Sequence, residues 1–317
     1  MARSEKISID IGYGDVKVCT GGNRIFKFPT AIKKITGTSV ELGEDPTARL
    51  FNGKKYHVGE KALDGALTTR SFEFLKGYSA LLIYEAVARS GEEYVNAAKN
   101  GLLAISIGLS LKDWNKKDEY TTLLEKINVN NEVLVPQVFL YPQGDGIFAF
   151  HDNPEGNIVV VDIGYNTFDF LVYLDRRPQR EACFATAEGA NMLVREVKKY
   201  LTKKYSLDFT EQEVNKHIAN GHILIGGKKD DLGEIITDAK EGYAEHIANQ
   251  MLNNNETLLR KADRIIFSGG GSYYLEGADI EKYLGIENSA ILPKDNAEYE
   301  NVIGYFNKME RILNASE

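Results

Sequence analysis

Two segments of this chain, Asp10-Ile-Gly12 and Asp162-Ile-Gly164, place an acidic residue and a glycine in the same arrangement. Around each, alternating apolar residues predict a strand, a tight turn and a returning strand. Glycine lets backbone N–H groups approach a phosphate closely, because it has no Cβ. An aspartate beside that phosphate needs a cation between them, usually hydrated Mg²⁺. Two such hairpins facing each other would clamp a triphosphate from both sides.

The presence of two copies of the Asp-x-Gly segment favours a phosphate site over an ordinary hairpin turn. A single Asp-x-Gly would be an ordinary hairpin turn, but both copies share the string Asp-Ile-Gly-Tyr and have matching flanks. They lie about one domain length apart, which favours a duplicated domain.

Two further segments suit the same chemistry. Ser268-Gly-Gly-Gly271 follows a predicted buried strand and allows close backbone approach to a nucleotide base, sugar or α-phosphate. Gln143, in Tyr141-Pro-Gln-Gly144, could orient an attacking water, although by itself this segment would be a plain turn. No Walker loop or early GxGxxG occurs, which argues against P-loop and dinucleotide enzymes. Gly226-Gly-Lys-Lys229 is interpreted as a solvated loop between helices.

The elements that must position these residues alternate between strands and helices, which predicts an α/β fold. Thr210 with Glu213 three residues later predicts a helix N-terminus. Strands are predicted within 5–19 (two), 24–28, 55–58, 102–109, 128–141 (one or two), 157–161, 168–174 and 264–267. Helices are predicted over 72–99, 116–126, 192–205, 210–220, 235–259 and 297–313.

Composition excludes several classes of protein. The 317 residues include 43% apolar and 26% charged side chains, an ordinary globular mixture. The net charge of −8 disfavours direct binding to nucleic acid. No apolar run could span a bilayer and no long apolar leader is seen, so we expect a cytoplasmic protein without a membrane partner. Cys19 and Cys183 lack a C-x-x-C spacing and are expected to be buried thiols.

In order, these segments resemble the five-part signature of the actin and sugar-kinase ATPase superfamily. Each part is weak alone, but five in order over essentially the whole chain are specific. Within the superfamily, 26–30 (FKFPT) and 56–62 (YHVGEKA) resemble segments of the ParM-like plasmid-segregation actins and their archaeal and bacterial relatives. Gln143 stands where ParM proteins carry Glu and conventional actins carry Gln. The five parts are Asp10-x-Gly12, Pro142-Gln-Gly144, Asp162-x-Gly164-x-x-Thr167, Gly269-Gly-Gly271 and Glu300-Asn-Val-Ile-Gly-Tyr305.

This resemblance implies a fold and a site. The fold is that of the actin, sugar-kinase and heat-shock-chaperone ATPases, with two duplicated ribonuclease-H-like domains around a nucleotide cleft. Domain I would be 1–155, joined by the C-terminal helix of about 297–317, and domain II 156–296. Asp10 and Asp162 would hold Mg²⁺ through waters and act in catalysis with Gln143. ATP or ADP would contact Gly12, Tyr13, Gly14, Lys17, Gly164, Tyr165, Asn166, Thr167, Glu188, Gly189, Gly269, Gly270 and Gly271.

The function it implies is a filament-forming ATPase, with GTP as an alternative nucleotide and hydrolysis coupled to polymerisation. Its partners would be further copies of itself and a DNA-binding adaptor through which it moves plasmid or other mobile DNA. A nucleotide-responsive scaffold is one alternative. A small-molecule kinase is another, disfavoured because 102–112 contains no aspartate to serve as base. Asp169 would either support the second hairpin or face solvent.

Overall fold

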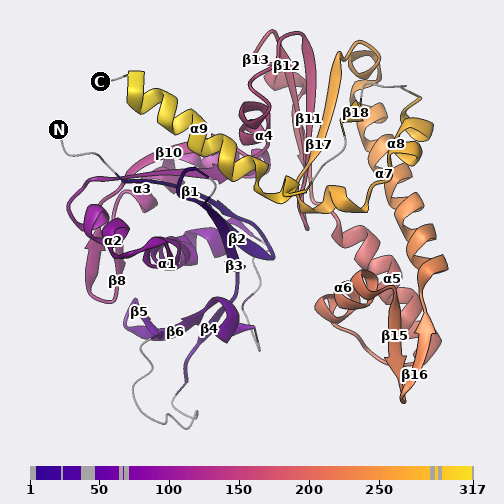
Figure 1. The fold of residues 1–317 in the computed structure, drawn as a ribbon, viewed down its shortest axis with the longest axis horizontal. Helices are drawn as coiled ribbons and strands as arrows, with labels where there is room; N and C mark the ends of the chain where they lie inside the picture. The colour runs from indigo at the N-terminus through magenta and orange to yellow at the C-terminus, as the bar shows by residue number, and fades with distance from the viewer. Residues whose placement is uncertain are drawn as a thin grey trace. The chain divides into compact units, whose positions relative to one another are not determined.

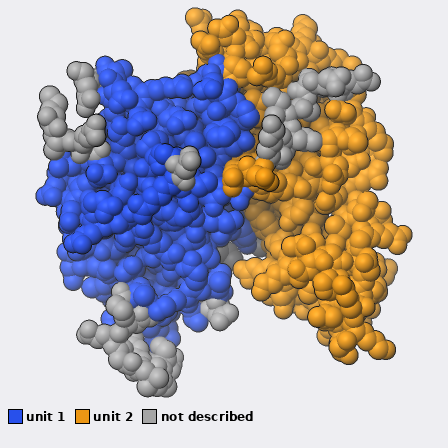
Figure 2. All heavy atoms as spheres, viewed as in Figure 1, with its two compact units in different colours: residues 1–153, 298–317 blue, residues 154–297 orange. Residues whose placement is uncertain are grey.

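The computed structural model describes residues 5–22, 24–36, 47–63, 67, 71–285, 290–291 and 295–315. The chain forms two compact units, Met1–Asn153 with Glu298–Glu317, and Pro154–Ala297 (Figure 2). Each unit has its own sheet and its own apolar core. Within the described ranges, no helix combines the length and the apolar character that crossing a membrane requires. The expectation about a leader concerns Met1–Ser4, which lie outside the described residues.

The first unit is built on a five-stranded sheet with the order β10-β7-β1-β2-β3 (Figure 1). Strands β1, β7 and β10 are parallel, while β1, β2 and β3 form an antiparallel meander. All seven positions of β7 are buried, as expected for a strand covered on both faces. The strands are β1 (Glu5–Ile11), β2 (Asp15–Cys19), β3 (Ile25–Pro29), β7 (Leu103–Leu109) and β10 (Gln137–Pro142).

Helices cover the two faces of this sheet differently. Ile7 and Ile9 of β1 belong to the core cluster formed with α1 (Phe72–Ser90). Cys19 and Ala104 instead pack with the last helix, α9 (Glu300–Ala315). Because neighbouring residues of a strand point to opposite faces, α1 and α9 lie on opposite sides of the sheet.

Three details of the first unit differ from expectation. The predicted helix over 72–99 is two helices, because Gly91 has φ +138°. Residues 127–142 form three strands instead of one or two, and α4 was not predicted. The remaining elements are β4 (Ile32–Lys34), β5 (Arg49–Phe51), β6 (Lys54–Val58), α2 (Glu92–Lys99), α3 (Lys117–Leu124), β8 (Ile127–Val129), β9 (Glu132–Leu134) and α4 (Asp145–Phe150).

The second unit repeats the central arrangement of the first. Strand β11 pairs antiparallel with β12 and parallel with β17, as β1 does with β2 and β7. The predicted duplication of the hairpin is therefore confirmed. The sheet has the order β13-β12-β11-β17-β18, with β14 also on β12. Its strands are β11 (Asn157–Ile163), β12 (Phe168–Leu174), β13 (Arg177–Pro178), β14 (Phe184–Thr186), β17 (Arg264–Ser268) and β18 (Ala290–Ile291).

Helices of the second unit largely follow the predicted periodicity. Thr210 and Glu213 form the expected capping box at the start of α6. The interpretation of residues 226–229 as a loop between helices is wrong, because Gly226 and Gly227 join β15 (His222–Ile225) to β16 (Lys228–Asp231), which contains the other two residues. Gly226 and Gly227 both have positive φ, as a two-residue hairpin turn requires. The helices are α5 (Asn191–Tyr205), α6 (Glu211–Asn220), α7 (Gly233–Leu259) and α8 (Gly277–Leu284).

Candidate functional site

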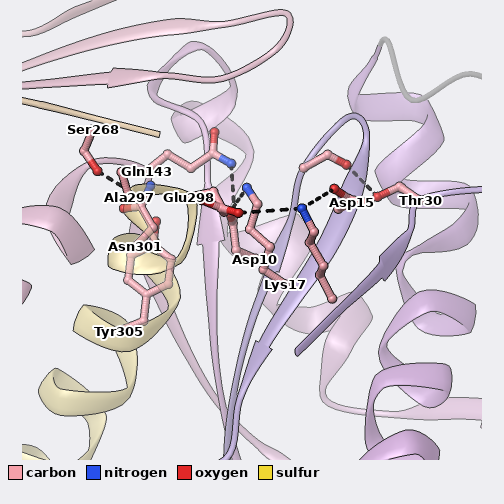
Figure 3. Close-up of polar contacts among 12 residues, drawn as sticks. Asp10, Asp15, Lys17, Thr30, Gln143, Ser268, Ala297, Glu298, Asn301 and Tyr305 are labelled. Atoms are coloured by element: carbon pink, nitrogen blue, oxygen red, sulfur yellow. Dashed lines mark hydrogen bonds and ion pairs between the residues drawn. The ribbon is translucent and has the colours of Figure 1, made fainter. Parts of the chain in front are cut away.

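Asp10, Lys17 and Gln143 meet at one edge of the first sheet (Figure 3). Asp10, the residue before the last in β1, lies opposite Lys17 of β2 and is only 4% exposed. Lys17 Nζ lies 3.2 Å from Asp10 Oδ2, and Gln143 Nε2 donates to Asp10 Oδ1 at 3.4 Å. A buried carboxylate is stabilised by such a cation and donor. These three predicted residues are therefore neighbours within one unit.

The tip of the first hairpin is closed by hydrogen bonds from two sides. Gly12 N–H donates to the Asp15 carbonyl at 3.0 Å, and a Cβ at Gly12 would lie 2.9 Å from that oxygen. Thr30 donates from its hydroxyl to the Gly12 carbonyl at 2.8 Å and from its N–H to the Gly14 carbonyl at 2.9 Å. Gly14 is exposed, with no atom within 4 Å of a Cβ built on it. The hairpin backbone is thus fixed at Gly12, whereas Gly14, which follows Tyr13, is exposed and has free space around it.

The second hairpin has the same turn but a different residue opposite its aspartate. Gly164 N–H donates to the Thr167 carbonyl at 2.9 Å. Asp162, 8% exposed, lies across from Asp169, whereas Asp10 lies across from a lysine. Asp169 is fully buried, so the solvent-facing alternative is wrong. Strand β12 is covered on both faces, since all its positions but the last are buried.

The loop before α5 packs directly on this second hairpin. Ala190 N–H donates to the Gly164 carbonyl at 3.0 Å, and Asn191 Nδ2 donates to Asn166 Oδ1 at 2.9 Å. A Cβ at Gly189 would lie 2.4 Å from the Gly164 carbonyl oxygen, so only glycine permits this approach. The Tyr165 hydroxyl donates to Glu211 at 2.8 Å, which directs that side chain toward α6.

Glu188 is contacted by two residues that were not predicted from the sequence. His246 Nε2 lies 3.0 Å from Glu188 Oε2, and Gln250 Nε2 donates to the same oxygen at 2.6 Å. Both belong to α7, four residues apart, so they share one helix face. That spacing is the only signal for them in the sequence.

The glycine run after β17 lies against Asp162. A Cβ at Gly269 would be 2.5 Å from Asp162 Oδ1, and one at Gly271 would be 2.5 Å from Ile163 Cγ2. Gly269 has φ +81°, a conformation that favours glycine. Gly270 is exposed and begins a 3₁₀ turn, 270–274. Gly269 and Gly271 thus let this segment approach Asp162 and Ile163 more closely than residues with a side chain would permit.

The grouping of possible ligand side chains decides which kind of metal site the chain could form. Among the residues that the structure describes, no three His, Cys, Asp or Glu side chains form a group able to bind a metal ion. Mg²⁺ often keeps several waters and is bound by one or two carboxylates together with substrate phosphates. Asp10 and Asp162 each lie beside a glycine turn in their own unit, and each is the kind of carboxylate that such a site uses.

Comparison with known proteins covers both units. The family described as "Actin like proteins N terminal domain" matches residues 8–146, and "Archaeal actin homologue MreB-like, C-terminal" matches 160–278. No curated protein sequence gives a significant match.

Solved structures are similar over nearly the whole chain. The crystal structure of Ta0583, an archaeal actin homologue, has a TM-score of 0.80 and 21% identity over 97% of this chain and 99% of that one. Its complex with ADP has a TM-score of 0.78 and 19% identity, with the same coverage. A 15-stranded ParM filament from Clostridium botulinum has a TM-score of 0.77 and 20% identity, covering 98% and 99%.

Proposed function

Because the chain is an actin-like protein with a fold like that of ParM, we propose that it is a filament-forming ATPase whose hydrolysis is coupled to polymerisation. The family and the two-domain actin-like fold, both predicted from the motifs, are confirmed by the family matches and the structural likeness. One observation carries the activity: in each unit an aspartate lies one residue before the end of a strand, beside a glycine turn, and Gln143 reaches the first of these aspartates.

Phosphoryl transfer to water needs positioning and charge neutralisation more than covalent chemistry. Lys17 and the backbone around Gly12 and Gly14 would contact the phosphates from the first unit. Gly164, Asn166 and Thr167 would contact them from the second. Mg²⁺, held through waters by Asp10 and Asp162, would neutralise phosphate charge when bound. The nucleoside would be contacted by Glu188, Gly189, Gly269, Gly270 and Gly271. Tyr13 and Tyr165 would contact the nucleotide from the tips of the two hairpins.

Gln143 would orient the attacking water. A neutral amide can accept and donate hydrogen bonds but is a poor base, so its contribution is positional. Its 3.4 Å contact with Asp10 places that amide at the end of β1, next to the carboxylate proposed to face the metal. The same edge of the sheet would therefore hold the phosphate and present the water.

Self-association is proposed from the relatives. The Clostridium botulinum ParM is a 15-stranded filament, and Ta0583 was crystallised with ADP. We expect this chain likewise to bind a nucleotide and to polymerise, with ATP preferred and GTP as the alternative. Cytoplasmic location and a role in moving plasmid or other mobile DNA belong to the same proposal.

Assembly should accelerate hydrolysis. Phosphate release, measured with Mg²⁺ and ATP over a series of protein concentrations, is expected to rise faster than linearly once sedimentable polymer appears. GTP in a parallel series tests nucleotide preference. Strictly linear release without polymer would contradict the proposal and favour a kinase. Polymer without release would favour a nucleotide-responsive scaffold.

Any DNA cargo should be contacted through an adaptor. The net charge of −8 opposes binding to a phosphate backbone, and Lys198 and Lys204 are paired with Asp208 and Asp230. In a gel-shift series near physiological salt, the protein alone is expected to leave duplex DNA unshifted. Tight, salt-sensitive binding of bare duplex would overturn the adaptor part of the proposal while leaving the ATPase part intact.

A further inference from the structure

Helix α9 contacts the turn that carries Gln143 on both sides of that residue (Figure 3). The Gly144 N–H donates to Asn301 Oδ1 at 3.0 Å, and the Tyr305 hydroxyl donates to the Pro142 carbonyl at 3.3 Å. Asn301 is 5% exposed and Tyr305 is fully buried. The Gly144–Asn301 contact is therefore buried and the Tyr305–Pro142 contact partly buried, and losing a buried hydrogen bond leaves a polar group unsatisfied.

Gln143 has few other backbone constraints. Its N–H donates to the Leu109 carbonyl at 2.9 Å, which extends the pairing of β10 with β7 by one residue. The next residue, Gly144, has φ +86°, so the chain leaves the strand direction there and enters α4. The direction of the Gln143 side chain thus depends on how this turn is held, and α9 supplies the contacts on either side.

Helices α9 and α4 are packed too tightly to slide past each other. A Cβ at Gly304 would lie 1.7 Å from the Gly146 carbonyl oxygen, so the two backbones touch. Tyr305 stacks on Tyr141 with ring centroids 5.7 Å apart and an interplanar angle of 16°. Burial, followed by the nearby Asp145 charge, raises the pKa of Tyr141 to about 12. Lys308 forms an ion pair with Asp145 at the start of α4.

From this geometry we infer that Asn301 and Tyr305 are positioning residues for the hydrolytic water. They act through Gln143, by fixing the carbonyl before it and the N–H after it. The inference rests on the proposed ATPase function and deepens it, because it assigns control of water orientation to the last helix. Neither residue needs to touch the nucleotide for this role.

Kinetics of three variants separate positioning from general stabilisation. Asn301→Ala is expected to lower kcat about tenfold or more, since small misplacement of a positioning group is costly, while nucleotide Kd stays within about twofold. Asn301→Asp keeps an acceptor for Gly144 N–H at a helix N-terminus and should restore most of the rate. In a Gln143→Ala background, Asn301→Ala should cause no further loss. An equal loss in both backgrounds would overturn the inference.

Hydrogen exchange gives a readout that does not depend on turnover. In the full chain labelled with ¹⁵N-glycine, the Gly144 amide should exchange at least about tenfold faster in Asn301→Ala than in wild type or Asn301→Asp. Tyr305→Phe provides a second variant, expected to lower kcat without changing nucleotide Kd. Unchanged exchange and unchanged kcat in Asn301→Ala would overturn this inference alone. A wild type without any hydrolysis would overturn the proposed function as well.

Discussion

Replacing Gly304 with alanine is expected to destabilise the protein by about 3 kcal/mol or more, among the largest effects of any single methyl group in this chain. The added Cβ would lie 1.7 Å from the Gly146 carbonyl oxygen and 2.5 Å from its carbonyl carbon. Backbone atoms of a packed helix cannot move aside as a flexible side chain can. Helix α9 must therefore shift away from α4, which weakens its packing on the sheet.

Gly242→Ala is the matched control for this substitution. Gly242 is an exposed glycine within α7, and a Cβ built on it has no atom within 4 Å. Alanine is favoured over glycine in a helix by about 1 kcal/mol, so this variant should be slightly more stable than wild type. Urea unfolding midpoints followed by circular dichroism measure both. If Gly304→Ala unfolds at the wild-type midpoint, the close contact of α4 and α9 is wrong.

The second large effect concerns Asp162 and Gln143, which should fail in different ways. Asp162→Ala is expected to abolish binding of the Mg²⁺–nucleotide complex. The variant lacks a carboxylate that orients the metal ion, so the negative charge of the phosphates is no longer neutralised. Gln143→Ala should bind nucleotide normally but turn over roughly 10²-fold more slowly, by analogy with other positioning donors worth about 2–4 kcal/mol. Titration with a fluorescent ATP analogue and single-turnover phosphate release measure the two quantities.

Asp238→Ala controls for the change in charge. Asp238 is exposed on α7 in the same unit, so its removal changes the net charge equally without altering the hairpin. It should bind nucleotide like wild type. Chelating Mg²⁺ with EDTA should weaken binding by wild type and have little effect on Asp162→Ala. Equal loss of binding in Asp162→Ala and Gln143→Ala would contradict the separate roles given to these residues.

Local signals in the sequence were sufficient for most of the secondary structure and for the central repeat. The hairpins at Asp10 and Asp162 depend on alternating side chains and a glycine turn within a dozen residues, and both are present. The capping box at Thr210 is equally local. Some short elements were not predicted. Helix α4 has six residues, too few for a helical period to be recognised, and the strands joined by Gly226 and Gly227 have four residues each.

Which side chains meet at the site was decided by tertiary structure. Thr30 reaches Gly12, and Asn301 reaches Gly144, across stretches of chain that carry no shared pattern. Asp169 could be placed inside the sheet only once both faces of β12 were known to be covered. Strand pairing and turns arise from neighbouring residues and can be predicted from the sequence. Contacts between distant segments depend on how helices pack on a sheet, and side-chain periodicity alone does not specify that packing.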